Sequence, residues 1–148
     1  MRLGTAISEQ GCRRCPLWVG TKQVVSGKGP VPSEWMFVGE APGREEDRVG
    51  MPLVGASGRL FDKLLKEAKI DRGAVFVTNV VKHRPPENRK PKISEIKACA
   101  EWLKIEIRAV KPKTLVTLGK VAAEAIVRLT GRVEKVSMEM EHGQGRKR

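Results

Sequence analysis

The chain has 148 residues, the usual size of one domain and long enough to enclose a single hydrophobic core. Hydrophobic residues make up 40% of it, no apolar run approaches the roughly 18 residues that cross a bilayer, and its start lacks the apolar stretch of a signal peptide. We therefore expect a soluble, cytoplasmic protein without membrane contacts. Lys and Arg number 29 against 17 acidic residues, and the formal net charge of +12 favours nucleic acid as the partner, although many small basic proteins bind none.

Six segments carry the pattern of regular secondary structure. Strands are predicted at residues 35–39, 74–81 and 114–118, and amphipathic helices at residues 57–69, 93–110 and 121–129. This alternation is typical of a mostly parallel sheet with helices on both faces, in which ligands bind beyond the carboxyl ends of the strands. The rule directs attention to Gly39, Asn79 and Gly119. Beyond these segments the pattern ends, so we expect one domain at 1–131 and a flexible basic tail at 132–148.

A turn rich in glycine and proline follows the first predicted strand, with acids directly behind it. The run Gly39-Glu40-Ala41-Pro42-Gly43 allows close approach of the backbone at its two glycines, and its proline stiffens the turn. Glu45-Glu46-Asp47 comes next. In the simplest interpretation this is a tight turn with solvated carboxylates. Clustered acids in so basic a chain would repel DNA, however, unless they serve a cationic transition state or hold a water molecule.

The same run carries a resemblance to a known family. Residues 39–47 are similar to the first active-site motif of the family 4, or iron-sulfur type, uracil-DNA glycosylases. The resemblance extends to residues 12–17, 50–55, 78–86 and 112–119, and covers about residues 8–130 in all. It implies the glycosylase fold, a three-layer α/β/α sandwich with a central parallel sheet. It also implies a function in DNA repair, in which uracil is flipped out of DNA and its N-glycosidic bond is hydrolysed.

By this resemblance, Glu40 corresponds to the catalytic acid of the family. A carboxylate at this place orients the attacking water or stabilises the positive charge that develops on the sugar as the glycosidic bond breaks. Glu46 and Asp47 correspond to supporting acids, and Glu46 is included among the expected catalytic residues.

Four further positions are expected to line the uracil pocket. Gly39 and Gly43 bring the backbone close to the base, and Asn79 presents its amide to the uracil edge, where it accepts from N3–H and donates to O4. Cytosine has the reverse pattern and would leave buried polar groups unpaired. The alternative for Asn79 is an ordinary cap at a strand end. Leu53 stands where the family usually has a phenylalanine against the uracil ring, which weakens stacking on the base.

Three cysteines and one histidine are candidates for a metal centre. Cys12, Cys15 and Cys99 resemble three of the four ligands that hold the 4Fe-4S cluster of the family, and His83 stands at the place of the fourth. Histidine can ligate iron, and three cysteines with one histidine also suit tetrahedral zinc. A cluster, zinc and an empty site remain as alternatives, with the cluster preferred. A lone C-x-x-C also occurs in redox motifs and as structural thiols.

The C-terminal part departs from the family pattern. Family members continue to a fourth strand that ends in a His-Pro motif, whose histidine stabilises charge on the departing uracil, and the sequence after Gly131 does not match it. His142 is not followed by proline, so we do not assign it that role. We expect a fold shortened at its C-terminus, and a slower turnover, because losing one electrostatic donor costs about a hundredfold to a thousandfold in rate.

Two other functions remain open. The first is a noncatalytic DNA-binding or scaffold paralogue that retains the metal site. The second, a small nucleotide-binding protein, lacks a G-x-G-x-x-G or P-loop match. For the leading function the partner is uracil-containing DNA, and a monomer is assumed. The basic residues expected to contact the DNA backbone, or otherwise to form solvated surface, are Arg13, Arg14, Lys22, Lys82, Arg84, Arg89 and Lys90.

Overall fold

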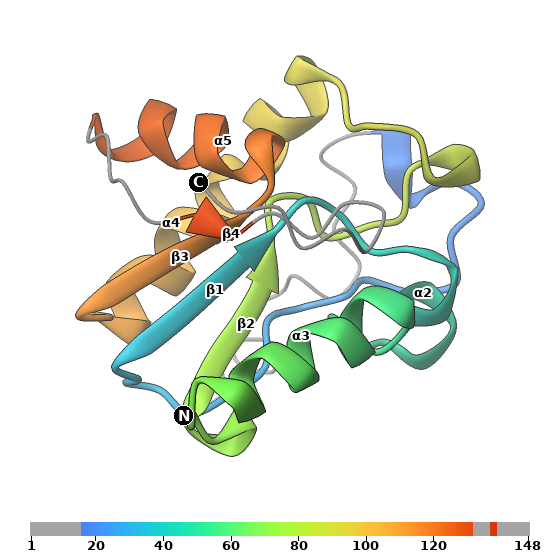
Figure 1. The fold of residues 1–148 in the computed structure, drawn as a ribbon. Helices are drawn as coiled ribbons and strands as arrows, with labels where there is room; N and C mark the ends of the chain where they lie inside the picture. The colour runs from blue at the N-terminus through green and yellow to red at the C-terminus, as the bar shows by residue number, and fades with distance from the viewer. Residues whose placement is uncertain (1–15, 132–136, 139–148) are drawn as a thin grey trace.

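A parallel sheet in the strand order β2-β1-β3-β4 forms the centre of the molecule (Figure 1). The computed structural model describes residues 16–131 and 137–138. Its strands are β1 (Trp35–Gly39), β2 (Val75–Asn79), β3 (Thr114–Leu118) and the two-residue β4 (Ser137–Met138). Gly39 of β1 is in register with Asn79 of β2, and Val38 with Thr117 of β3. The carboxyl ends of these three strands therefore lie at one edge of the sheet.

Helices cover both faces of this sheet (Figure 1). The longer helices are α3 (Ala56–Glu67) on one face and α4 (Ile93–Val110) and α5 (Lys120–Thr130) on the other. The short helix α2 (Arg44–Val49) precedes α3, and single turns of 3-10 helix form η1 (Pro16–Trp18), η2 (Arg72–Ala74) and η3 (Pro86–Asn88). In the part of the chain that the structure describes, every helix is too short or too polar to cross a membrane.

The alternation of side chains along the strands divides the core into two layers. Met36 and Val38 of β1 belong to the hydrophobic cluster under α4 and α5, which includes Leu103. Phe37 points to the other face and packs edge-on against Phe61 of α3, with 4.9 Å between ring centroids. These two layers confirm the α/β prediction of a parallel sheet between helices.

The three predicted strands and three predicted helices are confirmed, with boundaries shifted by at most two residues. Two elements were missed. The segment 44–49 was interpreted as a turn with acids but forms α2, which is mostly charged and has no apolar periodicity. Within the predicted tail at 132–148, Ser137 and Met138 form β4, which pairs with β3 through Thr117↔Ser137 and Leu118↔Met138. The rest of that tail lies outside the described residues.

Candidate active site

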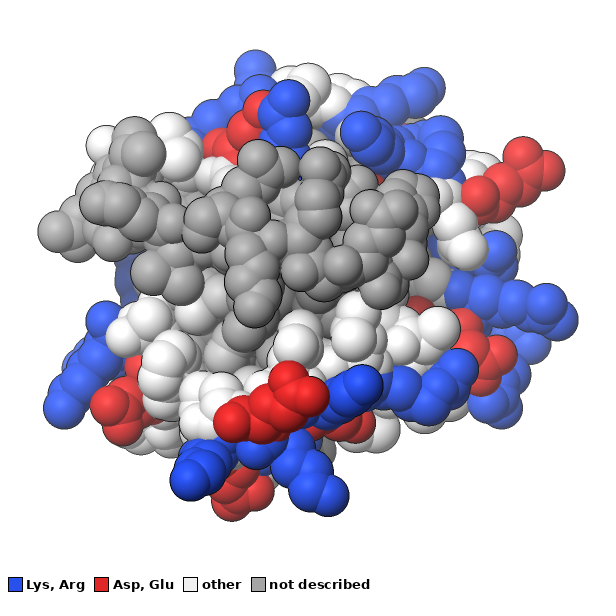
Figure 2. All heavy atoms as spheres, viewed as in Figure 1, with Lys and Arg blue, Asp and Glu red and all other residues white. Residues whose placement is uncertain are grey.

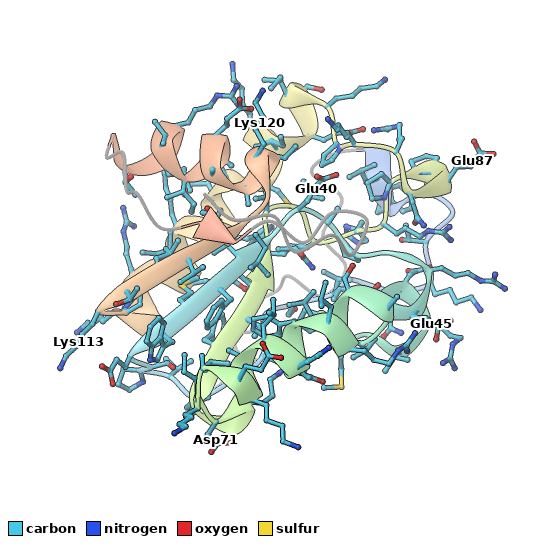
Figure 3. All side chains as sticks on the ribbon, viewed as in Figure 1. Glu40, Glu45, Asp71, Glu87, Lys113 and Lys120 are labelled. Atoms are coloured by element: carbon cyan, nitrogen blue, oxygen red, sulfur yellow. The ribbon has the colours of Figure 1, made fainter. Side chains whose placement is uncertain are left out.

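A cavity of about 510 Å³ opens at the carboxyl edge of the sheet. Its walls come from the turn after β1, the end of β2, the loop between β2 and α4, and the start of α5. In Figure 3, Glu40 lies beyond the tips of the strand arrows, on the side of Lys120, while Lys113 lies at the opposite end of the sheet. Six of the residues predicted from the sequence line this cavity: Gly39, Glu40, Gly43, Glu46, Leu53 and Asn79.

Glu40 is half-buried in the cavity, directly after β1. Burial raises the pKa of its carboxyl, and the positive charge of Lys90, which lines the same cavity, opposes that effect. The carbonyl oxygen of Glu40 accepts a hydrogen bond from the N–H of Val81 at 3.3 Å. This bond ties the turn after β1 to the residues that follow Asn79. The carboxylate of Glu40 and the amide of Asn79 therefore enter the cavity from hydrogen-bonded neighbouring segments.

Asn79 ends β2 and is 3% exposed. Its side chain lies over Gly39, because a Cβ atom at position 39 would stand only 2.6 Å from Asn79 Oδ1. Any larger residue at position 39 would push the amide aside. Gly39 thus provides the space in which the amide of Asn79 is held, with one acceptor and two donor positions available to a ligand.

Glu46 is buried, and both of its carboxylate oxygens accept hydrogen bonds from backbone amides. Oε1 accepts from Gly43 at 2.9 Å, while Oε2 accepts from Val54 at 3.0 Å and from Gly55 at 2.9 Å. Leu53, the residue before Val54, has a left-handed backbone conformation with φ of 52°, which is uncommon for leucine. In this arrangement Glu46 holds the turn that carries Leu53, and its expected catalytic role stays a prediction.

Asp47, the second acid expected to support catalysis, holds the N-terminal loop. Its Oδ1 accepts from the backbone N–H groups of Lys22 at 2.9 Å and Gln23 at 3.4 Å. The Gln23 side chain returns a hydrogen bond to the Asp47 carbonyl at 3.1 Å. These contacts fasten residues 22–23 to α2.

Lys82 does not make the DNA contact that was expected of it. Its side chain is 1% exposed, and Nζ donates to Glu106 Oε1 at 2.7 Å, to Thr78 Oγ1 at 2.6 Å and to the Asn79 carbonyl at 2.7 Å. An ammonium that is buried among three acceptors cannot reach a phosphate in solvent. The prediction was wrong because lysine is almost always exposed unless it is paired, and its partner lies on α4.

Exposed lysines stand at the mouth of the cavity. Lys90 and Lys120 both line it, and Figure 2 shows Lys and Arg side chains along much of the edge of the face viewed in Figure 1. Lys120 was missed, although it follows Gly119 at a strand end to which the sequence already pointed. Arg89 also lines the cavity and pairs with Glu95 at 2.8 Å. Arg13 and Arg14 lie outside the described residues.

The structure describes two of the four predicted metal ligands. Cys99 in α4 is 4% exposed and His83 in the loop after β2 is 6% exposed, so both are buried. Cys12 and Cys15 lie outside the described residues. Within 16–131 and 137–138, three or more His, Cys, Asp or Glu side chains do not come together as a metal site. The thiol and imidazole that are described have the donor chemistry of an iron-sulfur or zinc centre.

Comparison with known proteins decides the family. The sequence model of the uracil DNA glycosylase superfamily matches residues 26–148. The chain belongs to the uracil DNA glycosylase superfamily. It is 44% identical to the type-4 uracil-DNA glycosylase of Pyrobaculum aerophilum over 123 residues, which are 83% of this chain and 63% of that protein. It is 48% identical to the type-4 enzyme of Sulfurisphaera tokodaii over 110 residues, 74% of this chain and 50% of that protein.

A third uracil-DNA glycosylase of type 4, from Thermotoga maritima, is 43% identical over 116 residues, which are 78% of this chain and 60% of that protein. These matches confirm the resemblance to family 4 and the α/β sandwich that it implied. The chain spans 50% to 63% of the length of these three curated relatives. The expectation that this superfamily member lacks the C-terminal His-Pro motif falls on residues outside the described part and stays a prediction.

Proposed function

We propose that this protein recognises uracil in DNA and hydrolyses its N-glycosidic bond. The observation that carries the proposal is the meeting of Glu40 and the buried amide of Asn79 in one cavity at the carboxyl edge of the sheet. Its volume of about 510 Å³ lies in the range of small-molecule sites and suits a flipped-out nucleotide. The 43% to 48% identity to type-4 uracil-DNA glycosylases supports the same substrate.

Asn79 would read the base. Its amide oxygen accepts from uracil N3–H and its amide nitrogen donates to O4, which is the pattern that cytosine reverses. Because Asn79 is 3% exposed, a mismatched base would leave polar groups unpaired away from water. A site built in this way discriminates strongly against the wrong hydrogen-bond pattern.

Glu40 would act at the sugar. Water adds to C1′ while the C1′–N1 bond breaks, and uracil departs with the electron pair of that bond. The ionised carboxylate of Glu40 stabilises the positive charge on the sugar and orients the water, whose proton is then released. Lys90 and Lys120 at the mouth would bind phosphates on either side of the flipped nucleotide.

The proposal is tested with an oligonucleotide that carries one uracil and a label at its 5′ end, followed by alkaline cleavage at the abasic site. We expect cleavage at the uracil, and a rate about a hundredfold to a thousandfold lower for Glu40→Gln, because a group that stabilises the transition state is lost. Glu45→Gln is the matched control, since Glu45 is an exposed acid on the same segment that pairs with Arg48. Equal rates for the wild type and Glu40→Gln would contradict the proposal.

The alternative is a noncatalytic DNA-binding paralogue. It is favoured by Leu53, which lines the cavity without an aromatic ring to stack on the base, while Lys90 and Lys120 still offer phosphate contacts. The same assay separates the two functions. DNA binding that weakens with salt, together with no cleavage by the wild type, would support the alternative.

We also propose a structural metal centre, a 4Fe-4S cluster or else zinc, held by Cys12, Cys15, His83 and Cys99. Supporting evidence comes from the hydrophobic cluster that contains Cys99, because it also contains Leu17 and Val81, which are each two residues from a proposed ligand. Such a centre would fasten the N-terminal segment to α4. A brown protein that absorbs near 400 nm would support the cluster, and a colourless protein with stoichiometric zinc would support zinc. Protein purified with neither metal would contradict both.

A further inference from the structure

A buried ion pair lies directly behind the residue proposed to read the base. Lys82 and Glu106 each have side chains that are 1% exposed, and Lys82 Nζ lies 2.7 Å from Glu106 Oε1. The pair comes from two distant elements, the loop after β2 and the C-terminal half of α4. Neither residue lines the candidate cavity, so the pair acts on a bound base only through its neighbours.

The hydrogen bonds of this pair reach Thr78 and Asn79 at the end of β2. On one side, Thr78 donates its hydroxyl proton to Glu106 Oε1 at 2.9 Å and accepts from Lys82 Nζ at 2.6 Å. On the other side, Lys82 Nζ donates to the carbonyl oxygen of Asn79 itself at 2.7 Å. The end of β2 is therefore held both at the residue before the reading amide and at the peptide group after it.

Glu106 also fastens this network to a third segment. Its second oxygen, Oε2, accepts from the N–H of Gly27 at 3.2 Å, in the loop that runs along the outer side of β2. Every proton of the Lys82 ammonium has an acceptor, and both oxygens of Glu106 have donors. A buried polar network in which every group has a partner makes the surrounding structure rigid. We therefore expect this network to fix the position of the Asn79 backbone.

Stability alone does not account for a buried ion pair at this place. Burying two charges costs solvation, and replacing such a pair by apolar residues of similar volume is often neutral or stabilising. Phe76 and Leu103, on the same strand and helix as Thr78 and Glu106, are buried apolar residues that are each 1% exposed. Because such a network gives no clear gain in stability over apolar packing, we look for its benefit in orientation: Lys82 Nζ donates to the carbonyl of Asn79.

We propose that Lys82 and Glu106 are positioning residues that hold the amide of Asn79 in the orientation needed to read uracil. The amide has little freedom of its own, because its oxygen lies against Gly39 and any shift of the backbone carries it along. This inference rests on the proposed function, since it concerns the same cavity. Misplacing a recognition group by about 1 Å costs on the order of a hundredfold in rate.

The test compares Lys82→Met, Glu106→Leu and the double variant that carries both changes. Each single variant leaves one buried charge without its partner and lowers the melting temperature, whereas the double variant regains most of that loss. Cleavage of uracil-containing DNA at saturating enzyme should stay about a hundredfold slower in the double variant, since the donor to Asn79 is still missing. A double variant that regains both melting temperature and rate would overturn the inference.

Matched controls come from the same helix and from a readout without substrate. The pair Lys104–Glu101 on α4 is exposed and 3.6 Å apart, so Lys104→Met with Glu101→Leu should leave the rate unchanged.

The NMR signals of the Asn79 side-chain amide, assigned with Asn79→Ala, should shift or double in the Lys82→Met/Glu106→Leu variant. Unchanged signals would overturn the inference whether or not the wild type cleaves. A wild type that does not cleave contradicts the proposed function alone, and shifted signals would then still support positioning.

Discussion

Replacing Glu46 by alanine should destabilise the protein by about 4 kcal/mol. The carboxylate accepts from the N–H groups of Gly43, Val54 and Gly55 at 2.9, 3.0 and 2.9 Å. Hydrogen bonds to a charged group contribute about 1.5 to 3 kcal/mol each, but only the Gly55 residue is buried, so the other two amides recover part of the loss by binding water. The bond to Gly55 at its full value, together with about 1 kcal/mol for each of the bonds to Gly43 and Val54, gives a loss of about 4 kcal/mol.

Glu46→Gln separates the charge from the shape of the side chain. Its single amide oxygen can keep the bonds to Val54 and Gly55, but its NH₂ group then faces the N–H of Gly43, so we expect a loss of about 2 kcal/mol. The measurement is urea unfolding followed by tryptophan fluorescence. Glu45→Ala is the control, because that neighbouring carboxylate is exposed and pairs only with Arg48. If Glu46→Ala unfolds at the same urea concentration as Glu45→Ala, the positioning role is refuted.

Four further substitutions test other parts of the site. Gly39→Ala places a Cβ atom 2.6 Å from the reading amide, so we expect cleavage to slow by about a hundredfold in single-turnover assays while the melting temperature changes little. Burial raises the pKa of Glu40, so its carboxylate is lost on acidification at a higher pH than an ordinary glutamate, and Lys90→Met should move the acid limb of kcat/KM further up. Because the pKa of Glu40 is higher in the folded than in the unfolded protein, its contribution to stability is present below the unfolded pKa and is lost as the pH rises through the folded pKa. Glu40→Gln should therefore raise the free energy of unfolding at neutral pH. Lys120→Ala should reduce the salt dependence of DNA binding by about 0.9 in the log–log slope, while Lys113→Ala, at the opposite end of the sheet, should not (Figure 3).

The sequence predicted that Gly39 and Asn79 would meet at one edge of the sheet, and both line the same cavity there, because this meeting follows from local patterns. Gly39 and Asn79 end apolar, β-branched segments, and the carboxyl ends of parallel strands meet at one edge. A helix at 44–49 escaped prediction because its residues are charged and it is stabilised by Glu46 bonding back to Gly43, not by an apolar face.

Contacts between distant residues are what the sequence could not supply. A lysine is expected at the protein surface, because lysine side chains are rarely buried unless they are paired. The sequence around Lys82 does not indicate that it pairs with Glu106 inside the core. The same holds for Glu46, whose role depends on Val54 and Gly55 folding back over α2. The family resemblance indicated that Glu40 and Glu46 are both important. The structure shows how the two differ: the carboxylate of Glu46 is bound by backbone N–H groups of the turn at 53–55, whereas Glu40 is half-buried in the cavity.

The most direct test of the account is the release of free uracil from DNA under single-turnover conditions. The wild type should release uracil and leave an equal amount of abasic sites, with no release of cytosine from a matched strand. Asn79→Ala should lose this activity by a factor of about a hundred or more, since a buried recognition group is removed. Release of uracil at the same rate by Asn79→Ala, or no release by the wild type, would contradict the claim that Glu40 and Asn79 form one uracil site.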